Sequence, residues 1–337
     1  MPRNRQNETA LLRKIVNASR PSELPPAVSL GIGDDAALLR PKPGHQTILT
    51  CDWFLEGTHF LREKHPPDSV GWKCLARAVS DIAAMGGTPR CFLLSLALPE
   101  THTGRWLDHF LGGLRRASRR FQCGLAGGDT TRQNEILINI TVVGEVRAGH
   151  AVPRSGARQG DTIYVSGRLG EAELGLQLVL CGKGLASKKN PLLRKHLYPE
   201  PRFQLGSWLA RKKIATAMMD LSDGLSRDLS RLCLASGVGA RLDSEQLAAA
   251  RVSPAGRQRV DDPLALALHG GDDYELLFTA PRGKLPSGPW KFKKLPIYPI
   301  GAITSGPNIV YYEAGKAVIL RPRGWDPFAV AAGYLAN

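Results

Sequence analysis

The chain has 337 residues, of which 43% are hydrophobic and 22% are charged, the composition of a globular protein long enough for two domains. No stretch approaches the roughly 20 apolar residues of a membrane-spanning helix, and the first residues lack a signal-peptide core, so we expect neither membrane insertion nor secretion. The net charge of +15 is dispersed without interleaved aromatic residues or a nucleic-acid-binding motif. We expect no nucleic-acid partner; attraction of phosphorylated anions and merely solvated basic faces both explain the charge.

Six cysteines are scattered along the chain, at positions 51, 74, 91, 123, 181 and 233. There is no CxxC motif and no Cys/His pairing at zinc-ligand spacing. This pattern predicts reduced thiols in a cytoplasmic protein.

The first 150 residues alternate predicted helices and strands. Apolar residues recur at helical spacing over 7–19, 70–87 and 104–121. Short apolar, β-rich runs predict strands over 47–52, 90–99, 123–129 and 135–146. A polar stretch with Gly and Pro, 152–161, then indicates a domain boundary.

The pattern resumes after that boundary. It predicts strands over 162–167, 216–220, 274–280 and 299–303, and helices over 171–180, 199–213 and 225–237. We therefore predict an α/β protein built of α+β layers, with one domain over 1–150 and a second over 151–337.

Three carboxylates share one context, because Asp52, Asp129 and Asp220 each end a short apolar run. Side chains at strand ends project into the crevice where α/β folds bind ligands. A single Asp at such a place is more often a turn or a helix cap. Only their number favours a shared acidic site.

Asp81 differs, because it lies inside the predicted helix 70–87 between Val79 and Ile82. It can pair with Arg77, one helical turn earlier. A carboxylate close to an apolar face needs a partner, however, and a metal ion would serve.

Gly followed by paired acids occurs twice, in GIGDDAALL (31–39), which contains Asp34 and Asp35, and in HGGDDYELLF (269–278), which contains Asp272. Glycine allows a ligand to approach the backbone closely. A plain surface turn or hairpin is the alternative at both places.

Three further stretches suit phosphate or metal. Ser222 and Asp223 precede a predicted helix, so Ser222 either caps that helix or faces a phosphate while Asp220 and Asp223 hold metal. AGGDTTR (126–132) joins a glycine turn to an acid, two hydroxyls and an arginine. Arg154 beside a Ser-Gly turn can clamp a phosphate, or it is an ordinary surface arginine.

Several well-known catalytic and nucleotide-binding motifs are absent, which excludes the enzyme classes that depend on them. The sequence has no GxxxxGK[ST], HExxH or GxSxG. GIGDDA fits a dinucleotide-binding pattern, but only seven residues separate its glycines from PKPG, and its two acids would repel a pyrophosphate. Carboxylate-rich sites suit Mg²⁺, which accompanies nucleotide phosphates, so we expect an ATP-type ligand reached through metal.

Taken together, these motifs resemble the thiamine-monophosphate kinase family. They are GIGDDAALL, TCDWFLEGTHF, LARAVSDIAAMGGTPR, GLAGGDTTR, RSGARQGDTIYVSG, MMDLSDGLSRDL and GGDDYELLFT, in this order over roughly residues 8 to 330. The wider superfamily includes aminoimidazole-ribotide synthetase and selenophosphate synthetase. The latter is disfavoured, because the first 30 residues hold no catalytic-looking Cys-Gly with Lys.

The resemblance implies an aminoimidazole-ribotide-synthetase-like fold, with an N-terminal mixed sheet and helices and a C-terminal α/β domain. It also implies a homodimer joined through the N-terminal domains, and ATP-dependent phosphorylation of thiamine monophosphate to thiamine diphosphate with several Mg²⁺ ions. A sister ATP-dependent synthetase is the alternative. It would share the acidic core but differ at His59, at GGDDYE and at the C-terminal aromatic residue.

Carried over position by position, the resemblance assigns site residues. Metal ligands would be Asp34 or Asp35, Thr50, Cys51, Asp52, Asp81, Asp129, Asp220 and Asp223. ATP would be contacted by Gly128, Asp129, Arg154 and Ser222, and thiamine monophosphate by His59, Asp272 and Trp325. The catalytic set would be Asp52, Asp81, Asp129 and Asp220.

The sequence departs from the family pattern at four of its positions. Cys51 replaces a hydroxyl residue, so only its backbone carbonyl would serve Mg²⁺. Leu111 stands where a Tyr commonly meets the nucleotide, and Gln133 replaces a Gly. Asp272 replaces a Glu, which shortens the side chain by one methylene.

Overall fold

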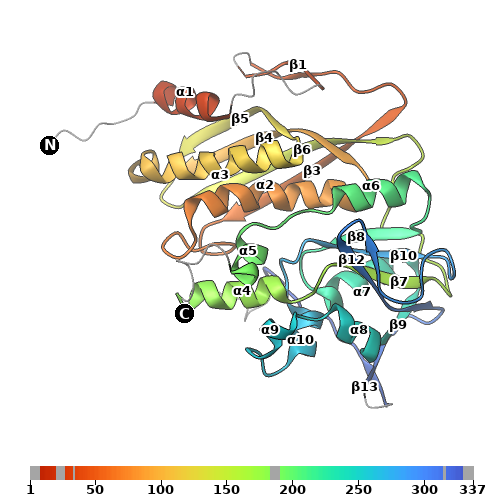
Figure 1. Cartoon of the computed structure of the whole chain (residues 1–337). Helices are drawn as coiled ribbons and strands as arrows, with labels where there is room; N and C mark the ends of the chain where they lie inside the picture. Colours follow the sequence, from red (N-terminus) through yellow and green to blue (C-terminus); the bar gives the residue numbers. More distant parts are fainter. Residues whose placement is uncertain (1–7, 20–26, 33–34, 183–189, 314–315, 329–337) are drawn as a thin grey trace. The chain divides into compact units, whose positions relative to one another are not determined.

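The computed structural model describes residues 8–19, 27–32, 35–182, 190–313 and 316–328 (Figure 1). Their contacts form two compact units. The first comprises the residues up to Ile82 together with Thr88–Ala148, and the second comprises Ala83–Gly87 and the residues from Gly149 onward. The boundary near residue 150 that the sequence suggested lies beside this division. No feature of the sequence indicates that Ala83–Gly87, at the end of the predicted helix 70–87, groups with the second unit.

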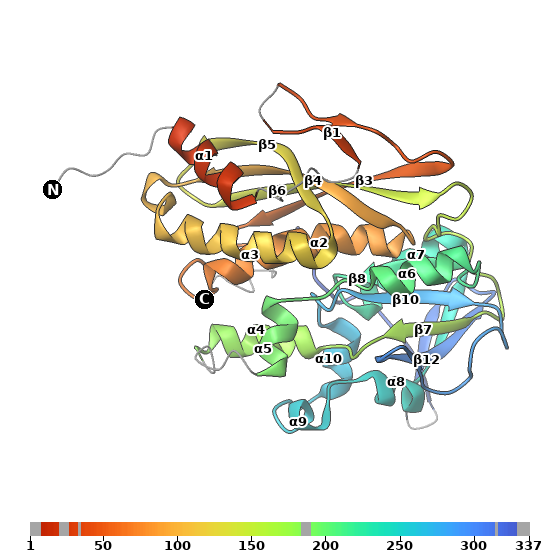
Figure 2. The same ribbon diagram turned by 45° about the horizontal axis from the view of Figure 1, so that its top comes forward.

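Within the described residues, the first unit is built on a four-stranded mixed sheet with strand order β3-β6-β4-β5 (Figure 2). Strands β4 and β5 run parallel, and the other neighbours are antiparallel. The strands are β3 (His45–Leu55), β4 (Thr88–Leu98), β5 (Gly124–Arg132) and β6 (Leu137–Arg147). The helices are α1 (Glu8–Ser19), α2 (Pro67–Ala84) and α3 (Arg105–Phe121), beside a 3-10 turn (Glu100–His102) and the ribbon β1 (Val28–Leu30) with β2 (Leu38–Leu39).

The two faces of this sheet differ sharply. Side chains alternate along β3, so Phe54 is 2% exposed whereas Leu49 and Trp53 are 69% and 55% exposed. Leu93 of β4 is also exposed. Helices α2 and α3 lie along one face of the sheet (Figure 1), and the guanidinium of Arg77 on α2 lies over the Phe54 ring, so this is the face that holds Phe54. The other face presents large apolar side chains to solvent.

Helices α2 and α3 touch backbone to backbone through glycine. A Cβ on Gly71 of α2 would lie 2.0 Å from the carbonyl oxygen of Phe110, and one on Gly113 of α3 would lie 1.8 Å from that of Asp68. These distances leave no room for a methyl group. The two helices can pack this closely only because both positions lack a side chain.

The described part of the second unit contains an eight-stranded sheet in which β14-β13-β9-β12-β7-β10-β8 are neighbours and β11 pairs with β12. Strands β9 and β13 are parallel, and the other neighbours are antiparallel. The strands are β7 (Thr162–Ser166), β8 (Ala217–Leu221), β9 (Gly239–Asp243), β10 (Glu275–Ala280), β11 (Trp290–Phe292), β12 (Leu295–Thr304), β13 (Ile309–Glu313) and β14 (Lys316–Ile319).

Helices pack on this sheet around separate apolar cores. One core joins the sheet to α7, α8 and α10, and another joins it to α6. The helices are α4 (Glu171–Leu180), α5 (Pro191–Leu197), α6 (Phe203–Arg211), α7 (Leu225–Ser236), α8 (Ser244–Ala250), α9 (Pro254–Arg257) and α10 (Pro263–His269). No helix in the described ranges of the chain is long and apolar enough to cross a bilayer.

Two strand ends expected from the sequence are wrong. Asp52 and Asp129 lie inside β3 and β5 rather than at their ends. Strand β3 continues because it stays paired with β6 as far as Leu55 and Leu137, and β5 stays paired with β4 as far as Arg132. The length of each strand is therefore set by its ladder partner and not by its own apolar run.

We predict that Gly113→Ala lowers the free energy of unfolding by about 1–3 kcal/mol, because the new methyl group must push α3 away from α2. Gly112→Ala is the matched control, since the nearest atom to a Cβ at Gly112 would be a guanidinium nitrogen of Arg116, 3.9 Å away. The control should stabilise the protein by up to about 1 kcal/mol through helix propensity. Urea unfolding measures both; equal effects of the two substitutions would contradict the packing.

Candidate active site

Two acids of the first unit border the helix-covered face of its sheet. The hydroxyl of Thr50 on β3 donates a hydrogen bond to the carboxylate of Asp81 on α2. Asp52 lies two residues further along β3, on the same face as Thr50, and is half-buried. The structure thus places Asp81 against Thr50, with Asp52 on the same face of the strand.

The Cys51 side chain points to the opposite, exposed face of the sheet. Its thiol contacts the side-chain amide of Asn139, with the sulfur 3.3 Å from Oδ1 and 3.1 Å from Nδ2. Only the backbone of Cys51 therefore borders the group around Asp81. Asn139 had not been singled out in the sequence, although a polar residue between Ile138 and Ile140 is a visible signal.

Gly128 and Asp129 lie on the other edge of the same sheet. Gly128 is in register with Leu94, Leu94 with Ile140, and Ile140 with Asp52. This row crosses three strand spacings, about 14 Å in all. Asp129 belongs to the next row, in register with Ser95, then Asn139 and Trp53, so the structure does not bring its side chain to the first acidic group.

The remaining predicted residues of the first unit are loop residues. Asp34 lies outside the described residues, and Asp35 is exposed in a bend. His59 accepts the backbone N–H of Leu55 at Nδ1, at 3.0 Å, and its ring stacks on Phe54 with centroids 5.7 Å apart. This hydrogen bond places the proton of a neutral His59 on Nε2.

Four predicted residues of the second unit gather beyond the end of β8. The backbone N–H of Asp272 donates to the carbonyl of Ser222 at 2.8 Å, and that of Trp325 donates to the carbonyl of Asp223 at 2.9 Å. Asp220 is buried on β8, paired in the ladder with Leu276. The resemblance had assigned these residues to metal, nucleotide and acceptor, and they share one corner of the unit.

Asp228 organises this corner, a role that the sequence did not reveal. Its buried carboxylate accepts the backbone N–H groups of Ser222 and Asp223, at 3.1 and 3.0 Å, and also contacts Arg231. Burial and the charge of Asp223 raise the pKa of Asp228 to about 7, while Arg231 and the two N–H groups oppose the rise. An acid inside the apolar helix 225–237 was the available signal.

The same corner corrects one of the two readings of Ser222. Helix α7 begins at Leu225, its N-cap is Gly224, and no side chain caps it. Ser222 is thus not the helix cap. The carboxylate of Asp223, expected to bind metal, is paired with Arg231 at 2.5 Å.

Arg154 lies at the opposite end of α7. Its carbonyl accepts the hydroxyl of Ser236, the last residue of that helix, and its side chain is exposed. Helix α7 has 12 residues and spans about 18 Å. The structure therefore does not group Arg154 with Ser222.

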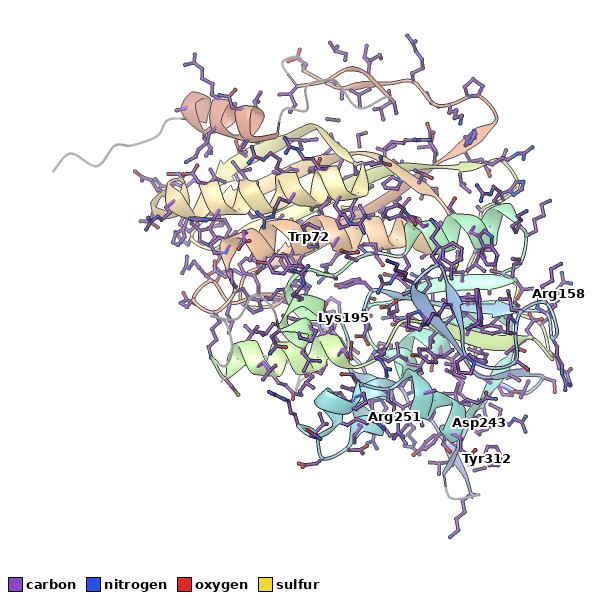
Figure 3. The ribbon with its side chains drawn as sticks, viewed as in Figure 1. Trp72, Arg158, Lys195, Asp243, Arg251 and Tyr312 are labelled. Atoms are coloured by element: carbon purple, nitrogen blue, oxygen red, sulfur yellow. The ribbon has the colours of Figure 1, made fainter. Side chains whose placement is uncertain are left out.

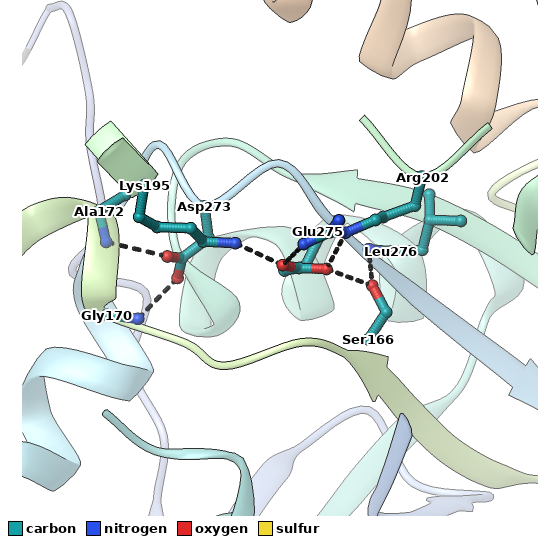
Figure 4. Close-up of polar contacts among 8 residues, drawn as sticks. All are labelled: Ser166, Gly170, Ala172, Lys195, Arg202, Asp273, Glu275 and Leu276. Atoms are coloured by element: carbon teal, nitrogen blue, oxygen red, sulfur yellow. Dashed lines mark hydrogen bonds and ion pairs between the residues drawn. The ribbon is translucent and has the colours of Figure 1, made fainter. Parts of the chain in front are cut away.

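A buried ionic cluster lies beside Asp273, the residue that follows Asp272 (Figure 4). Glu275 accepts hydrogen bonds from Lys195, Arg202 and Ser166. Burial opposes ionisation of Glu275, but Arg202 and Lys195 outweigh it and lower its pKa to about 2. Figure 3 labels Lys195 on α5, a helix missed in the sequence.

The oxygen donors fit Mg²⁺ in kind. Asp52, Asp81 and Asp220 are carboxylates in half-buried or buried positions, where a cation would offset the cost of desolvation. Across the described ranges, no three His, Cys, Asp or Glu side chains lie close enough together to hold a metal ion. Mg²⁺ commonly takes only one or two carboxylates and completes its shell with phosphates and water, which this arrangement permits.

Two family models match the chain. Residues 33–146 match the AIR synthase related protein, N-terminal domain, and residues 158–287 match the AIR synthase related protein, C-terminal domain. Together they cover most of both units.

Relatives with known names match over nearly the whole chain. The thiamine-monophosphate kinase of Salmonella typhimurium is 37% identical over 330 residues, which cover 96% of this chain and 98% of the relative. The crystal structure of that kinase from Stenotrophomonas maltophilia is 35% identical with a TM-score of 0.78, covering 92% of this chain and 98% of the other. AaThiL, solved in complex with AMPPCP and TMP, is 33% identical with a TM-score of 0.74, covering 97% and 99%. The chain belongs to the thiamine-monophosphate kinase family, within the AIR synthase related proteins.

Proposed function

We propose that this chain transfers the terminal phosphoryl group of ATP to thiamine monophosphate and so makes thiamine diphosphate. The observation that carries the proposal is 37% identity to a thiamine-monophosphate kinase along 96% of the chain. A family member binds both AMPPCP and TMP, which correspond to the two substrates. The main acidic positions, Asp52, Asp81, Asp129 and Asp220, are all present.

The chemistry demands charge neutralisation more than proton removal. The acceptor is already an anionic phosphate, so its oxygen needs little help from a general base. Two unit charges 4 Å apart repel by about 4 kcal/mol at an effective dielectric constant of 20, and these phosphates carry more than one charge each. Bound Mg²⁺ would neutralise the charge that develops between the two phosphates.

Each unit offers its own candidate ligands. Asp52 and Asp81 offer metal ligands in the first unit, and the hydroxyl of Thr50 fixes the orientation of Asp81. In the second unit Asp220 offers a further ligand. Ser222 and the N-terminus of α7 suit an anionic phosphate of the nucleotide. We assign His59, Asp272 and Trp325 to the acceptor.

We further propose that two copies of the chain associate through the exposed face of the first unit's sheet. Leu49, Trp53 and Leu93 present an apolar surface there that is unusual for a face left in water. A second copy offers the same apolar surface, as a two-fold symmetric interface requires. The proposed compartment is the cytoplasm, which agrees with six free thiols, all of them at described positions.

The direct test of function is an end-point assay with purified protein, ATP, Mg²⁺ and thiamine monophosphate, in which chromatography detects thiamine diphosphate. We expect product that disappears when Mg²⁺ is omitted. Absence of product, while ATP still raises the melting temperature, would contradict the proposal and favour a sister enzyme with another acceptor.

We predict that Thr50→Val raises the Mg²⁺ concentration needed for half-maximal activity by roughly tenfold or more, because a hydrogen bond to a charged group contributes about 1.5–3 kcal/mol. Thr50→Ser keeps the hydroxyl and should behave like the parent. Thr47→Val, at an exposed position of the same strand, is the control. An unchanged Mg²⁺ requirement in Thr50→Val would remove Asp81 from the metal site.

For the dimer, light scattering should give the mass of two 36.5 kDa chains for the parent protein. Trp53→Glu should give one chain, because a charge cannot be buried in an apolar interface without a partner. Leu234→Glu changes an exposed residue of α7 and should remain dimeric. A parent protein with the mass of one chain would overturn the proposed interface.

A further inference from the structure

The turn that carries Asp272 has an unusual backbone. Asp272 and Tyr274 have φ angles of +66° and +48°, in the left-handed region that glycine favours. This conformation is costly for a bulky residue such as Tyr, and it persists only where surrounding contacts enforce it. The backbone N–H groups of both residues donate to β8 and its loop, to Ser222 and Leu221, each at 2.8 Å.

The side chains of Asp273 and Glu275, which alternate with these two residues, anchor the turn (Figure 4). Asp273 is buried and accepts the backbone N–H groups of Gly170 and Ala172, at 2.6 and 3.2 Å, at the start of α4. Glu275 is held by the ionic cluster described above. The turn is therefore fixed by backbone and side-chain contacts from Asp272 to Glu275, and little freedom remains in its backbone.

The carboxylate of Asp272 contacts the buried side chains of Tyr274 and His196. The hydroxyl of Tyr274 donates to Oδ1 at 2.7 Å, and Nδ1 of His196 lies 3.7 Å from Oδ2. The Tyr274 and His196 residues are 2% and 1% exposed, whereas the Asp272 side chain is 27% exposed. Each oxygen thus faces one ring, and the carboxylate is oriented while part of it still reaches solvent.

We infer that Tyr274 and His196 are positioning residues that orient the Asp272 carboxylate toward a hydrogen-bond donor or positive charge on the acceptor. This inference rests on the proposed function, because only there is Asp272 assigned to the acceptor. It also gives α5, which carries His196, a part in the acceptor site. Asp272 is one methylene shorter than the Glu usual in the family, so its direction depends on the turn and the two rings.

The first test is Tyr274→Phe, which removes one hydroxyl and keeps the buried ring. Steady-state kinetics should show a KM for thiamine monophosphate raised about tenfold, with the KM for ATP unchanged. Tyr164→Phe is the matched control, because Tyr164 is also buried and donates its hydroxyl elsewhere, to the carbonyl of Pro286 at 3.2 Å. The control should leave both KM values unchanged.

A double-mutant cycle separates positioning from general stability. In an Asp272→Asn background, Tyr274→Phe should raise the KM for thiamine monophosphate no further, because its effect acts through Asp272. His196→Leu should show the same dependence on Asp272, and it provides the test should Tyr274→Phe not fold.

Four outcomes would overturn the inference. Two of them leave the proposed function standing, because the parent protein still forms thiamine diphosphate. In the first, Tyr274→Phe keeps the parent's KM for thiamine monophosphate; in the second, it raises the KM values for thiamine monophosphate and ATP alike. Fully additive effects in the cycle would also overturn the inference. A parent protein that neither binds nor phosphorylates thiamine monophosphate would overturn the proposed function and this inference together.

Discussion

The second unit depends on the burial of one negative charge, that of Glu275. A buried carboxylate is tolerated only when it is paired and hydrogen-bonded, and removal of a partner would leave an uncompensated charge. Lys195 from α5, Arg202 at the start of α6 and Ser166 at the end of β7 meet this requirement together. The cluster therefore fixes three elements around the first residue of β10, directly beside the turn that presents Asp272.

The first unit also holds partly buried carboxylates, and its sheet has two unlike faces. On the covered face the carboxylates near α2 are held at moderate burial, where the Thr50 hydroxyl satisfies one of them. On the other face the apolar residues Leu49 and Trp53 are left exposed. The alternation of side chains along β3 thus places the proposed metal ligands Thr50 and Asp52 on one face and the proposed association surface on the other.

Much of this organisation was visible in the sequence because long amphipathic helices and β-rich runs have strong periodicity. The helices over 7–19 and 104–121 differ from the observed α1 and α3 by a residue or so. Short elements such as α5 and α10 were missed, because helices of seven residues show too little periodicity and are defined by caps such as Asp262.

The candidate site was also only partly predictable from the sequence. The acids themselves could be recognised from motifs, but their partners could not. Asp228, Tyr274 and His196 act through contacts with residues that only the fold brings near. The ion pair between Asp223, just before α7, and Arg231, in the second turn of that helix, likewise required the structure.

The measurement that tests the account most directly is the rate of thiamine diphosphate formation at a fixed concentration of the Mg²⁺–ATP complex while free Mg²⁺ is varied. If acids of the protein hold ions beyond the one that accompanies ATP, the rate must rise with free Mg²⁺. A rate that depends on the Mg²⁺–ATP complex alone would contradict the assignment of Asp52, Asp81 and Asp220 as metal ligands.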